Sequence, residues 1–168
     1  YPDLVAYLGQ AGATSPSVAQ LREAVLAIRR RKAMVLDPDD PDTRSVGSFF
    51  VNPVVPEARR ERIASAAGVA PPAFAAGPGQ VKIPAAWLIE HAGFHKGMSD
   101  GRVGISGKHT LALVNRGGAT ARDLIRLATR IKRTVGERFD VWLRPEPVFA
   151  GLAGDAEVEF LRAAHENG

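Results

Sequence analysis

Arg44–Pro53 reads RSVGSFFVNP and combines a glycine, a serine, two adjacent aromatic residues and an Asn-Pro pair. The Phe-Phe-Val run favours a short buried strand, and Pro53 ends its pairing because proline has no N–H to donate. Gly47 permits backbone angles, or a close approach, that a side chain would prevent. We therefore expect Ser48 and Asn52 at the two ends of a rigid apolar element, which makes this stretch the first candidate for a functional site.

The whole chain has the length and composition of one globular domain. It has 168 residues, of which 45% are hydrophobic and 24% charged, far from the composition of a disordered protein. No apolar run predicts a membrane span, and no pattern predicts a signal peptide. The absence of cysteine excludes disulfides and thiolate metal sites and fits the cytoplasm. Because the chain begins at Tyr1 and not at Met, the interpretation as a fragment of a longer protein is kept open.

The chain is basic, with 22 Lys and Arg against 18 Asp and Glu and a net charge of +4. This balance favours an anionic partner, either nucleic acid or a phosphorylated small molecule, although it also fits an ordinary soluble surface. The cluster Arg29–Lys32 ends a predicted helix, where cations stabilise the dipole. Its alternative role is to bind phosphate or carboxylate. A basic binding module for nucleic acid or another phosphorylated ligand, without catalysis, is the alternative function.

The periodicity of the sequence predicts an α+β fold. We expect helices over 1–10, 17–31, 56–67, 84–92, 119–138 and 155–165, and strands over 49–51, 81–83, 103–106, 111–115 and 141–143. A small mixed or antiparallel sheet should pack with these helices in two layers as a single domain 1–168. Its core should span about 17–151, and 152–168 should form a C-terminal tail helix.

Three details of this interpretation concern charged or loop segments. The acidic loop 37–44 lacks the glycine pivot and distal glutamate of a calcium loop, so we interpret it as a solvated connector. Residues 69–80, rich in Pro, Ala and Gly, are expected to form a long mobile loop. Lys132 is assigned to the solvent face of the 119–138 helix.

A few side chains could carry chemistry. His91 and His95 are four residues apart, but Gly93 should end the helix between them and no HExxH motif exists, so no metal site is predicted. Glu146 lies between Pro145 and Pro147, which should hold it stiffly at a strand end. His109, on a turn before a buried strand, could donate to an anion. For Glu146 and His109 the alternative is an ordinary solvated side chain.

Six sequence blocks carry a family resemblance. In order along the chain they are Lys32, Gly47–Pro53, Val81–Ile89, Leu113–Asn115, Ala119–Asp123 and Leu143–Glu146. Together they resemble the C-terminal part of the UDP-N-acetylenolpyruvoylglucosamine reductases (the MurB family), flavoenzymes of peptidoglycan synthesis. The resemblance spans roughly residues 7–151 and includes the highly specific motif Gly-Ser-Phe-Phe-x-Asn-Pro.

The resemblance implies an oxidoreductase, UDP-N-acetylmuramate dehydrogenase. In that family NADPH reduces FAD, and the flavin delivers hydride to UDP-N-acetylglucosamine enolpyruvate to form UDP-N-acetylmuramate. By the resemblance, Ser48 protonates the adjacent carbon and Glu146 helps to stabilise the intermediate. Lys32, Asn52 and His109 match positions that bind the substrate.

The resemblance also implies what this chain lacks. The FAD-binding domains of the family precede this region, and nothing like their glycine-rich phosphate segments occurs in the sequence. The FAD site should therefore lie in an absent N-terminal domain, and the chain alone should neither bind FAD nor turn over. The implied partners are the UDP-sugar and that domain, without nucleic acid, membrane or metal. The implied setting is cytoplasmic cell wall biogenesis, cell shape and cell division.

Overall fold

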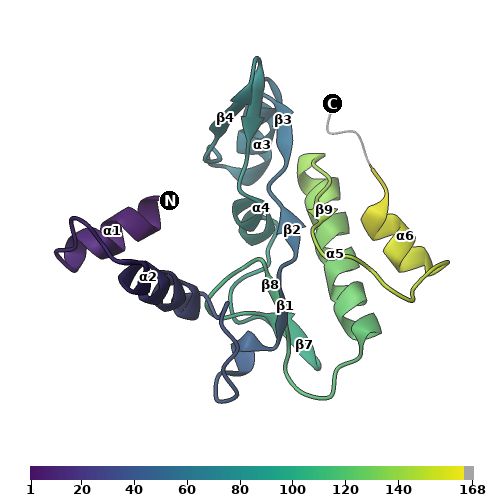
Figure 1. Cartoon of the computed structure of the whole chain (residues 1–168). Coiled ribbons are helices and arrows are strands. Elements are labelled where there is room, and N and C mark those ends of the chain that lie inside the picture. The colour runs from purple at the N-terminus through teal and green to yellow at the C-terminus, as the bar shows by residue number, and fades with distance from the viewer. Residues whose placement is uncertain (165–168) are drawn as a thin grey trace.

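The structure, a computed structural model, describes residues 1–164 and confirms the predicted α+β class (Figure 1). The helices of this part of the chain are α1 (Pro2–Gln10), α2 (Val18–Arg31), the short 3-10 helix η1 (Pro41–Thr43), α3 (Arg59–Ala67), α4 (Ala85–His91), α5 (Ala121–Phe139) and α6 (Ala156–Arg162). Its strands are β1 (Ser45–Ser48), β2 (Phe50–Val51), β3 (Val54–Pro56), β4 (Phe74–Gly77), β5 (Gln80–Lys82), β6 (Ser99–Asp100), β7 (Val103–Ile105), β8 (Ala112–Asn115) and β9 (Arg144–Pro145). The end of the predicted tail helix, from His165 onward, lies outside the described residues.

The strands form three small sheets, in which every pairing is antiparallel. Their orders are β1-β8-β7-β6, β2-β9 and β3-β5-β4. The stretch 44–53 contributes β1 to the first sheet and β2 to the second, and β3 of the third sheet follows directly after Pro53. Figure 1 shows β1, β2 and β3 following one another through the middle of the molecule. This stretch therefore connects all three sheets.

The predicted Phe-Phe-Val strand is divided at Phe49. Phe49 and Phe50 are both 1% exposed, with ring centroids 5.0 Å apart, whereas Val51 is 48% exposed. Successive side chains of a regular strand point to opposite faces, but here the pairing partner changes from β8 at Ser48 to β9 at Phe50. Phe49 N–H donates to Leu111 O at 2.8 Å. The predicted burial is right for the two aromatic residues and wrong for Val51.

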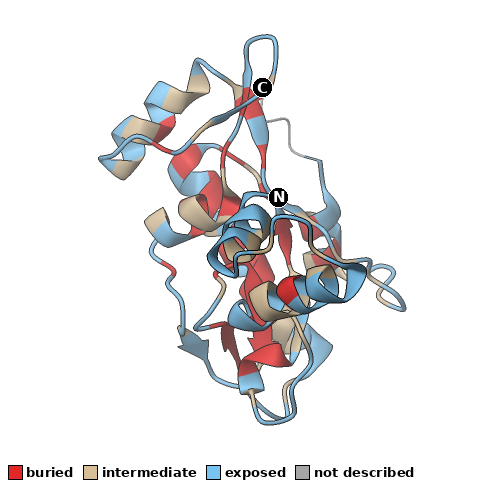
Figure 2. Ribbon diagram, turned by 60° about the vertical axis from the view of Figure 1, so that its left-hand side comes forward, coloured by how far each residue is buried: buried red, intermediate tan, exposed pale blue. Residues whose placement is uncertain are grey.

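Helix α5 covers the core side of the strands, as Figure 1 shows. It begins at the capping box formed by Thr120 and Asp123, and its apolar stripe is buried at Ile125, Ala128, Ile131 and Val135. Helices α1 and α2 lie to one side, where α2 buries only Ala24 and α1 buries no residue. Figure 2 shows most of the two helices in the exposed and intermediate colours. The core therefore lies between α5, α4 and the strands.

Several predicted boundaries are corrected. Pro56 ends β3 instead of opening a helix, because its segment pairs with β5, and α3 begins at Arg59. The segment 69–80 is not one long loop. It contains β4 and the first residue of β5, and these two strands form a hairpin. Residues 141–143 form no strand. Val141 and Leu143 are buried instead, and pairing begins at Arg144 because β2 offers only two partner residues.

The assignment of Lys132 to the solvent face of the 119–138 helix is wrong. It is 0% exposed, and its Nζ donates to the carbonyls of Phe160, Leu161 and Ala163 at 2.8, 2.9 and 3.0 Å. Its aliphatic stem is buried while its ammonium group satisfies carbonyls at the end of α6. Burial, and to a smaller extent Arg144, lower the pKa of Lys132 to about 8.

The acidic loop 37–44 is also more than a solvated connector. Asp42 is 7% exposed, and Thr43 beside it is buried. Thr43 Oγ1 donates to the carbonyls of Asp37 and Asp40, and Asp40 Oδ1 accepts from Asp42 N–H. These bonds fold the loop into the 3-10 turn η1, which directs the Asp42 carboxylate inward.

In the part of the chain that the structure describes, no helix has both the length and the apolar character that a membrane crossing requires.

Candidate functional site

Four of the five predicted site residues line a single cleft of about 520 Å³. They are Lys32, Ser48, His109 and Glu146. They come from four segments that are far apart in the sequence, so only the fold brings them together. The fifth predicted residue, Asn52, does not line this cleft.

The pairing of β2 with β9 brings Glu146 next to the Ser48 strand. Phe50 lies opposite Pro145, and Glu146 N–H donates to Phe49 O at 2.9 Å. Glu146 is therefore held by its backbone one residue beyond the position of Ser48. Its side chain is exposed to the cleft solvent rather than buried.

Gly47 gives Ser48 its place at the end of β1. Its φ is +79°, a region that L side chains rarely adopt, and Gly47 N–H donates to Ser45 Oγ at 3.2 Å. The β1–β8 register is irregular between Ser45 and Ser48, where Ser48 pairs with Ala112. The irregularity turns the end of the strand, and Ser48 is half-buried at the cleft.

His109 is held as a neutral donor. Its Nδ1 accepts from Leu111 N–H at 3.1 Å, so the proton of the neutral ring lies on Nε2. Burial is the main cause that lowers the pKa of His109, followed by the positive charges of Lys32 and Lys96. Such a ring can donate one hydrogen bond to an anion without carrying a charge itself.

Lys32 is the C-cap residue of α2 and supplies an ammonium group. Its Nζ lies 2.9 Å from Asp3 Oδ2 in an exposed ion pair. The hydrogen bond from Lys32 is the main cause that lowers the pKa of Asp3. Exposed ion pairs are weak, so an anionic ligand in the cleft can compete with Asp3 for this ammonium.

Asn52 has a different local role. Its Oδ1 accepts from Ala85 N–H at 2.8 Å and so satisfies one of the free amide groups at the start of α4. Its side chain is exposed. The structure thus places Asn52 at the start of α4. Its contact with a ligand stays a prediction.

Arg29 lines the same cleft, although the sequence interpretation favoured helix capping for it and kept ligand contact as the alternative. It precedes Lys32 by three residues, and residues three apart lie on the same helix face. That spacing was the available signal. The cleft therefore has two cationic side chains from one helical segment.

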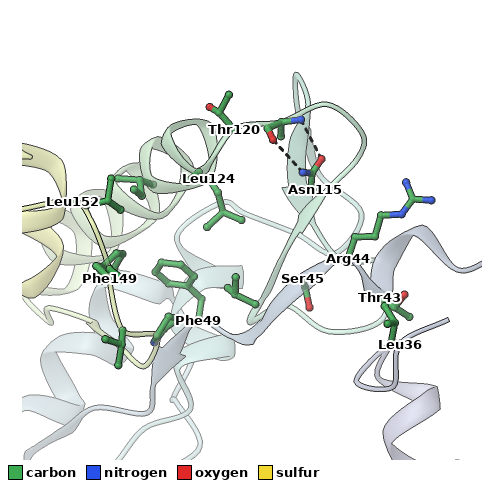
Figure 3. Close-up of a pocket in the computed structure, with 17 residues that line it drawn as sticks. Leu36, Thr43, Arg44, Ser45, Phe49, Asn115, Thr120, Leu124, Phe149 and Leu152 are labelled. Carbon is green, nitrogen blue, oxygen red and sulfur yellow. Dashed lines mark hydrogen bonds between the residues drawn. The ribbon is translucent and has the colours of Figure 1, made fainter. Parts of the chain in front are cut away.

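A second hollow, of about 560 Å³, shares Val46 and Pro147 with the cleft. Figure 3 shows Phe49, Leu124, Phe149 and Leu152 gathered around it. Arg44 is the one charged residue among the described residues that line it. It offers apolar surface without a pair of acid and base groups, so the Ser48 cleft is the better candidate for chemistry.

Within residues 1–164, no cluster of three or more His, Asp or Glu side chains could hold a metal ion. His91, one of the two histidines considered for a metal, stacks on Trp87 with ring centroids 3.9 Å apart. Its Nδ1 lies 2.8 Å from Trp87 O. This histidine is therefore engaged in local packing.

Residues 38–150 match the family model described as UDP-N-acetylenolpyruvoylglucosamine reductase, C-terminal domain. The UDP-N-acetylenolpyruvoylglucosamine reductase of Thermobifida fusca is 51% identical over 158 residues, which cover 90% of this chain and 44% of that protein. The proteins of the same name from Corynebacterium diphtheriae and Streptomyces coelicolor are 49% and 51% identical, over 91% of this chain and 41% and 42% of their own lengths. The chain thus spans less than half the length of these relatives.

Proposed function

The chain belongs to the UDP-N-acetylenolpyruvoylglucosamine reductase family, whose C-terminal domain it matches, and from this premise we propose that it is the substrate-binding half of that oxidoreductase in peptidoglycan synthesis. The proposed reaction converts UDP-N-acetylglucosamine enolpyruvate to UDP-N-acetylmuramate. The single observation that carries the proposal is the convergence of Ser48, Glu146, Lys32 and His109 on one cleft.

The proposed cofactors are FAD and, as its reductant, NADPH, with hydride supplied by the flavin when it is bound. The glycine-containing start of α5 does not fit the phosphates of FAD. The glycine pair Gly117–Gly118 precedes α5 in the manner of a phosphate loop, but Gly117 N–H and Ala119 N–H already donate to Asn115 Oδ1. Asp123 also places a carboxylate at this helix start, where it would repel phosphate. We therefore assign FAD to a preceding part of the whole protein.

Ser48 is proposed as the proton donor. It would protonate the carbon next to the one that receives hydride, which is general acid catalysis. A serine hydroxyl is a weak acid, so the step requires a strongly basic intermediate and a fixed geometry. The positive φ of Gly47 and the backbone hydrogen bond between Glu146 and Phe49 support such a geometry.

Glu146 is proposed to stabilise the enol-type intermediate together with a positive group from the preceding domain. Lys32 and His109 are proposed to bind the anionic part of the UDP-sugar, one by its ammonium charge and the other by its neutral Nε2–H. Asn52 is retained as a proposed contact to the nucleotide-sugar from its place at the start of α4. The site is proposed to work in the cytoplasm, in cell wall biogenesis linked to cell shape and division.

The test uses a chimera in which the part of the Thermobifida fusca relative that precedes the matched region is joined to this chain. In Ser48→Ala, flavin reduction by NADPH should keep its rate. Reoxidation of the reduced flavin by the enolpyruvyl substrate should slow by a factor of about 10² to 10⁴. Stopped-flow absorbance of the flavin measures both half-reactions separately.

The matched control is Ser65→Ala, since Ser65 is an exposed serine on α3. It should leave both half-reactions unchanged. Full activity of Ser48→Ala in the second half-reaction would remove the assignment of Ser48 as the proton donor.

A further inference from the structure

Asp42 is the buried member of the four carboxylates in the loop 37–44. Its side chain is 10% exposed, and its position is set by the 3-10 turn η1, in which Asp40 Oδ1 accepts from Asp42 N–H at 3.1 Å. A buried carboxylate is expensive unless hydrogen bonds and an opposite charge satisfy it. The partners of Asp42 are therefore informative about its role.

The two oxygens of Asp42 accept from residues on both sides of His109 in the sequence. Oδ2 accepts from Ser106 Oγ at 2.8 Å and from Gly107 N–H at 2.7 Å. Oδ1 accepts from Arg116 Nη1 at 3.2 Å. Arg116 Nη2 in turn donates to Ile105 O at 3.0 Å, so the same network includes the end of β7.

The network continues to the residue next to His109. Ser106 Oγ accepts from Lys108 N–H at 3.0 Å, whereas the exposed ion pair of Lys108 Nζ with Asp40 Oδ2, at 2.5 Å, lies outside this network. On the other side, Ala112 N–H donates to His109 O at 3.0 Å. Residues 106, 107 and 108 are thus tied to the acidic loop, and His109 is held from both sides.

We propose that Asp42 is a positioning residue of the substrate cleft, whose buried carboxylate fixes the turn 106–109 so that His109 presents its Nε2–H to the ligand. This inference rests on the proposed function, because it assigns His109 to ligand binding. Turn residues are ordinarily among the more mobile parts of a fold, whereas a binding group needs placement to within about 0.5 Å. Asp42 resolves that conflict by acting on the backbone of the turn.

A carboxylate, and not an amide, suits this position. Asp42 receives three donors, from Ser106, Gly107 and Arg116. An ionised carboxylate only accepts, whereas a carboxamide would turn its NH₂ group toward at least one of these donors. Asp42→Asn therefore keeps the size of the side chain and breaks the network from within.

The experiment compares Asp42→Asn and Ser106→Ala with the control Lys108→Met in the full 168-residue chain. Lys108→Met removes the exposed ion pair with Asp40 and keeps the backbone N–H that Ser106 accepts. Nitrogen-15 NMR of the imidazole reports the tautomer of His109. A titration with UDP-N-acetylglucosamine reports the affinity of the cleft.

Wild-type and Lys108→Met proteins should show the Nε2–H tautomer of His109 and affinities within twofold of each other. Asp42→Asn and Ser106→Ala should show a mixture of tautomers and an affinity lower by a factor of about 5 to 10, in line with the loss of one well-placed hydrogen bond. If Asp42→Asn does not fold, Ser106→Ala carries the test.

The positioning role is overturned if these variants lower the melting temperature but leave the His109 tautomer and the affinity as in the wild type. A different result would bear on the proposed function alone. If His109→Ala binds UDP-N-acetylglucosamine as the wild type does, while Ser106→Ala still changes the tautomer, His109 is positioned by Asp42 but is no ligand of the UDP-sugar.

Discussion

His109 combines a fixed ring with a neutral charge. Leu111 N–H occupies Nδ1, and burial, with Lys32 and Lys96 nearby, lowers the pKa of the ring. Protonation would require the Nδ1 acceptor to become a donor and would place a third positive charge near two ammonium groups. The folded state therefore binds a proton at His109 less readily than the unfolded chain does.

This difference gives a pH-dependent contribution to stability. As the pH falls below the ordinary histidine pKa of about 6.5, the unfolded chain takes up the proton first, so the folded state loses stability. The contribution is fully present above that pH. The unfolding free energy of wild type minus that of His109→Gln should therefore decrease between pH 7.5 and pH 5, as measured by urea denaturation. A difference that stays constant or grows on acidification would contradict the sign.

The site residues that the sequence could predict are those near or within sequence blocks with a family resemblance. Ser48, Glu146 and Lys32 stand in ordered blocks that resemble one family, His109 lies between two of these blocks, and the four residues line one cleft. Asp42 was interpreted as part of a solvated connector, because the loop lacks the glycine pivot and the distal glutamate of a calcium loop. Its partners Ser106 and Gly107 lie more than 60 residues away, so no local pattern could reveal the burial.

At the scale of elements, local signals predicted helix ends better than strand pairings. Capping boxes at Ser17 and Thr120 begin α2 and α5 in the structure, close to the predicted helix starts at residues 17 and 119. The hairpin of β4 and β5 was missed, because its small residues Ala75, Ala76 and Gly77 have low strand propensity. It forms through its pairing with β3, a contact between segments distant in sequence.

Lys132 joins α5 to α6. Replacing it in Lys132→Met should keep much of the buried stem but leave the carbonyls of Phe160, Leu161 and Ala163 without the ammonium donor. We expect a loss of about 2 kcal/mol or more in unfolding free energy and faster amide hydrogen exchange in α6. The control Arg126→Gln changes an exposed cation of the same helix and should change neither quantity. Unchanged exchange in α6 of Lys132→Met would contradict the capping role.

Gly136 permits the close packing of α5 against Trp142. A Cβ added at Gly136 would lie 2.5 Å from two carbon atoms of the Trp142 ring. Replacement of glycine by alanine inside a helix ordinarily stabilises it by about 1 kcal/mol, but here the clash should dominate and cost about 1–3 kcal/mol. The control is Gly9→Ala in α1, where nothing lies within 4 Å of the added Cβ. Denaturant unfolding should show opposite signs for the two variants, and a stabilised Gly136→Ala protein would refute the steric argument.

At the scale of the whole molecule, the cleft forms where one connecting stretch joins the β1-β8-β7-β6 sheet to the β2-β9 sheet. Residues 44–53 end β1 at Ser48 and pair through β2 with the segment that carries Glu146. The turn of His109 reaches the same place because β8 pairs with β1. Helix α2 and its C-cap residue, otherwise peripheral because α2 buries one residue, supply Arg29 and Lys32 to the same cleft. Cationic side chains in one cleft with Ser48 and Glu146 match a ligand with one anionic and one reactive end.

The cleft allows a test between the two kinds of anionic partner that the basic composition left open, a phosphorylated small molecule and nucleic acid. If the cleft binds a UDP-sugar, the position of a cation should matter more than its charge. Lys32→Gln should lower the affinity for UDP-N-acetylglucosamine about tenfold, because it removes a charge-assisted hydrogen bond. Arg30→Gln, the same charge change at an exposed residue of α2 outside the cleft, should stay within twofold of the wild type. Generic nucleic acid binding would instead depend on the summed charge, and its affinity would fall steeply with salt.

Calorimetric titrations distinguish the two cases. Wild type, Lys32→Gln and Arg30→Gln are titrated with the UDP-sugar and with duplex DNA, each at two salt concentrations. Equal losses in both variants, or tighter binding of DNA than of the UDP-sugar, would favour the basic binding module over the reductase.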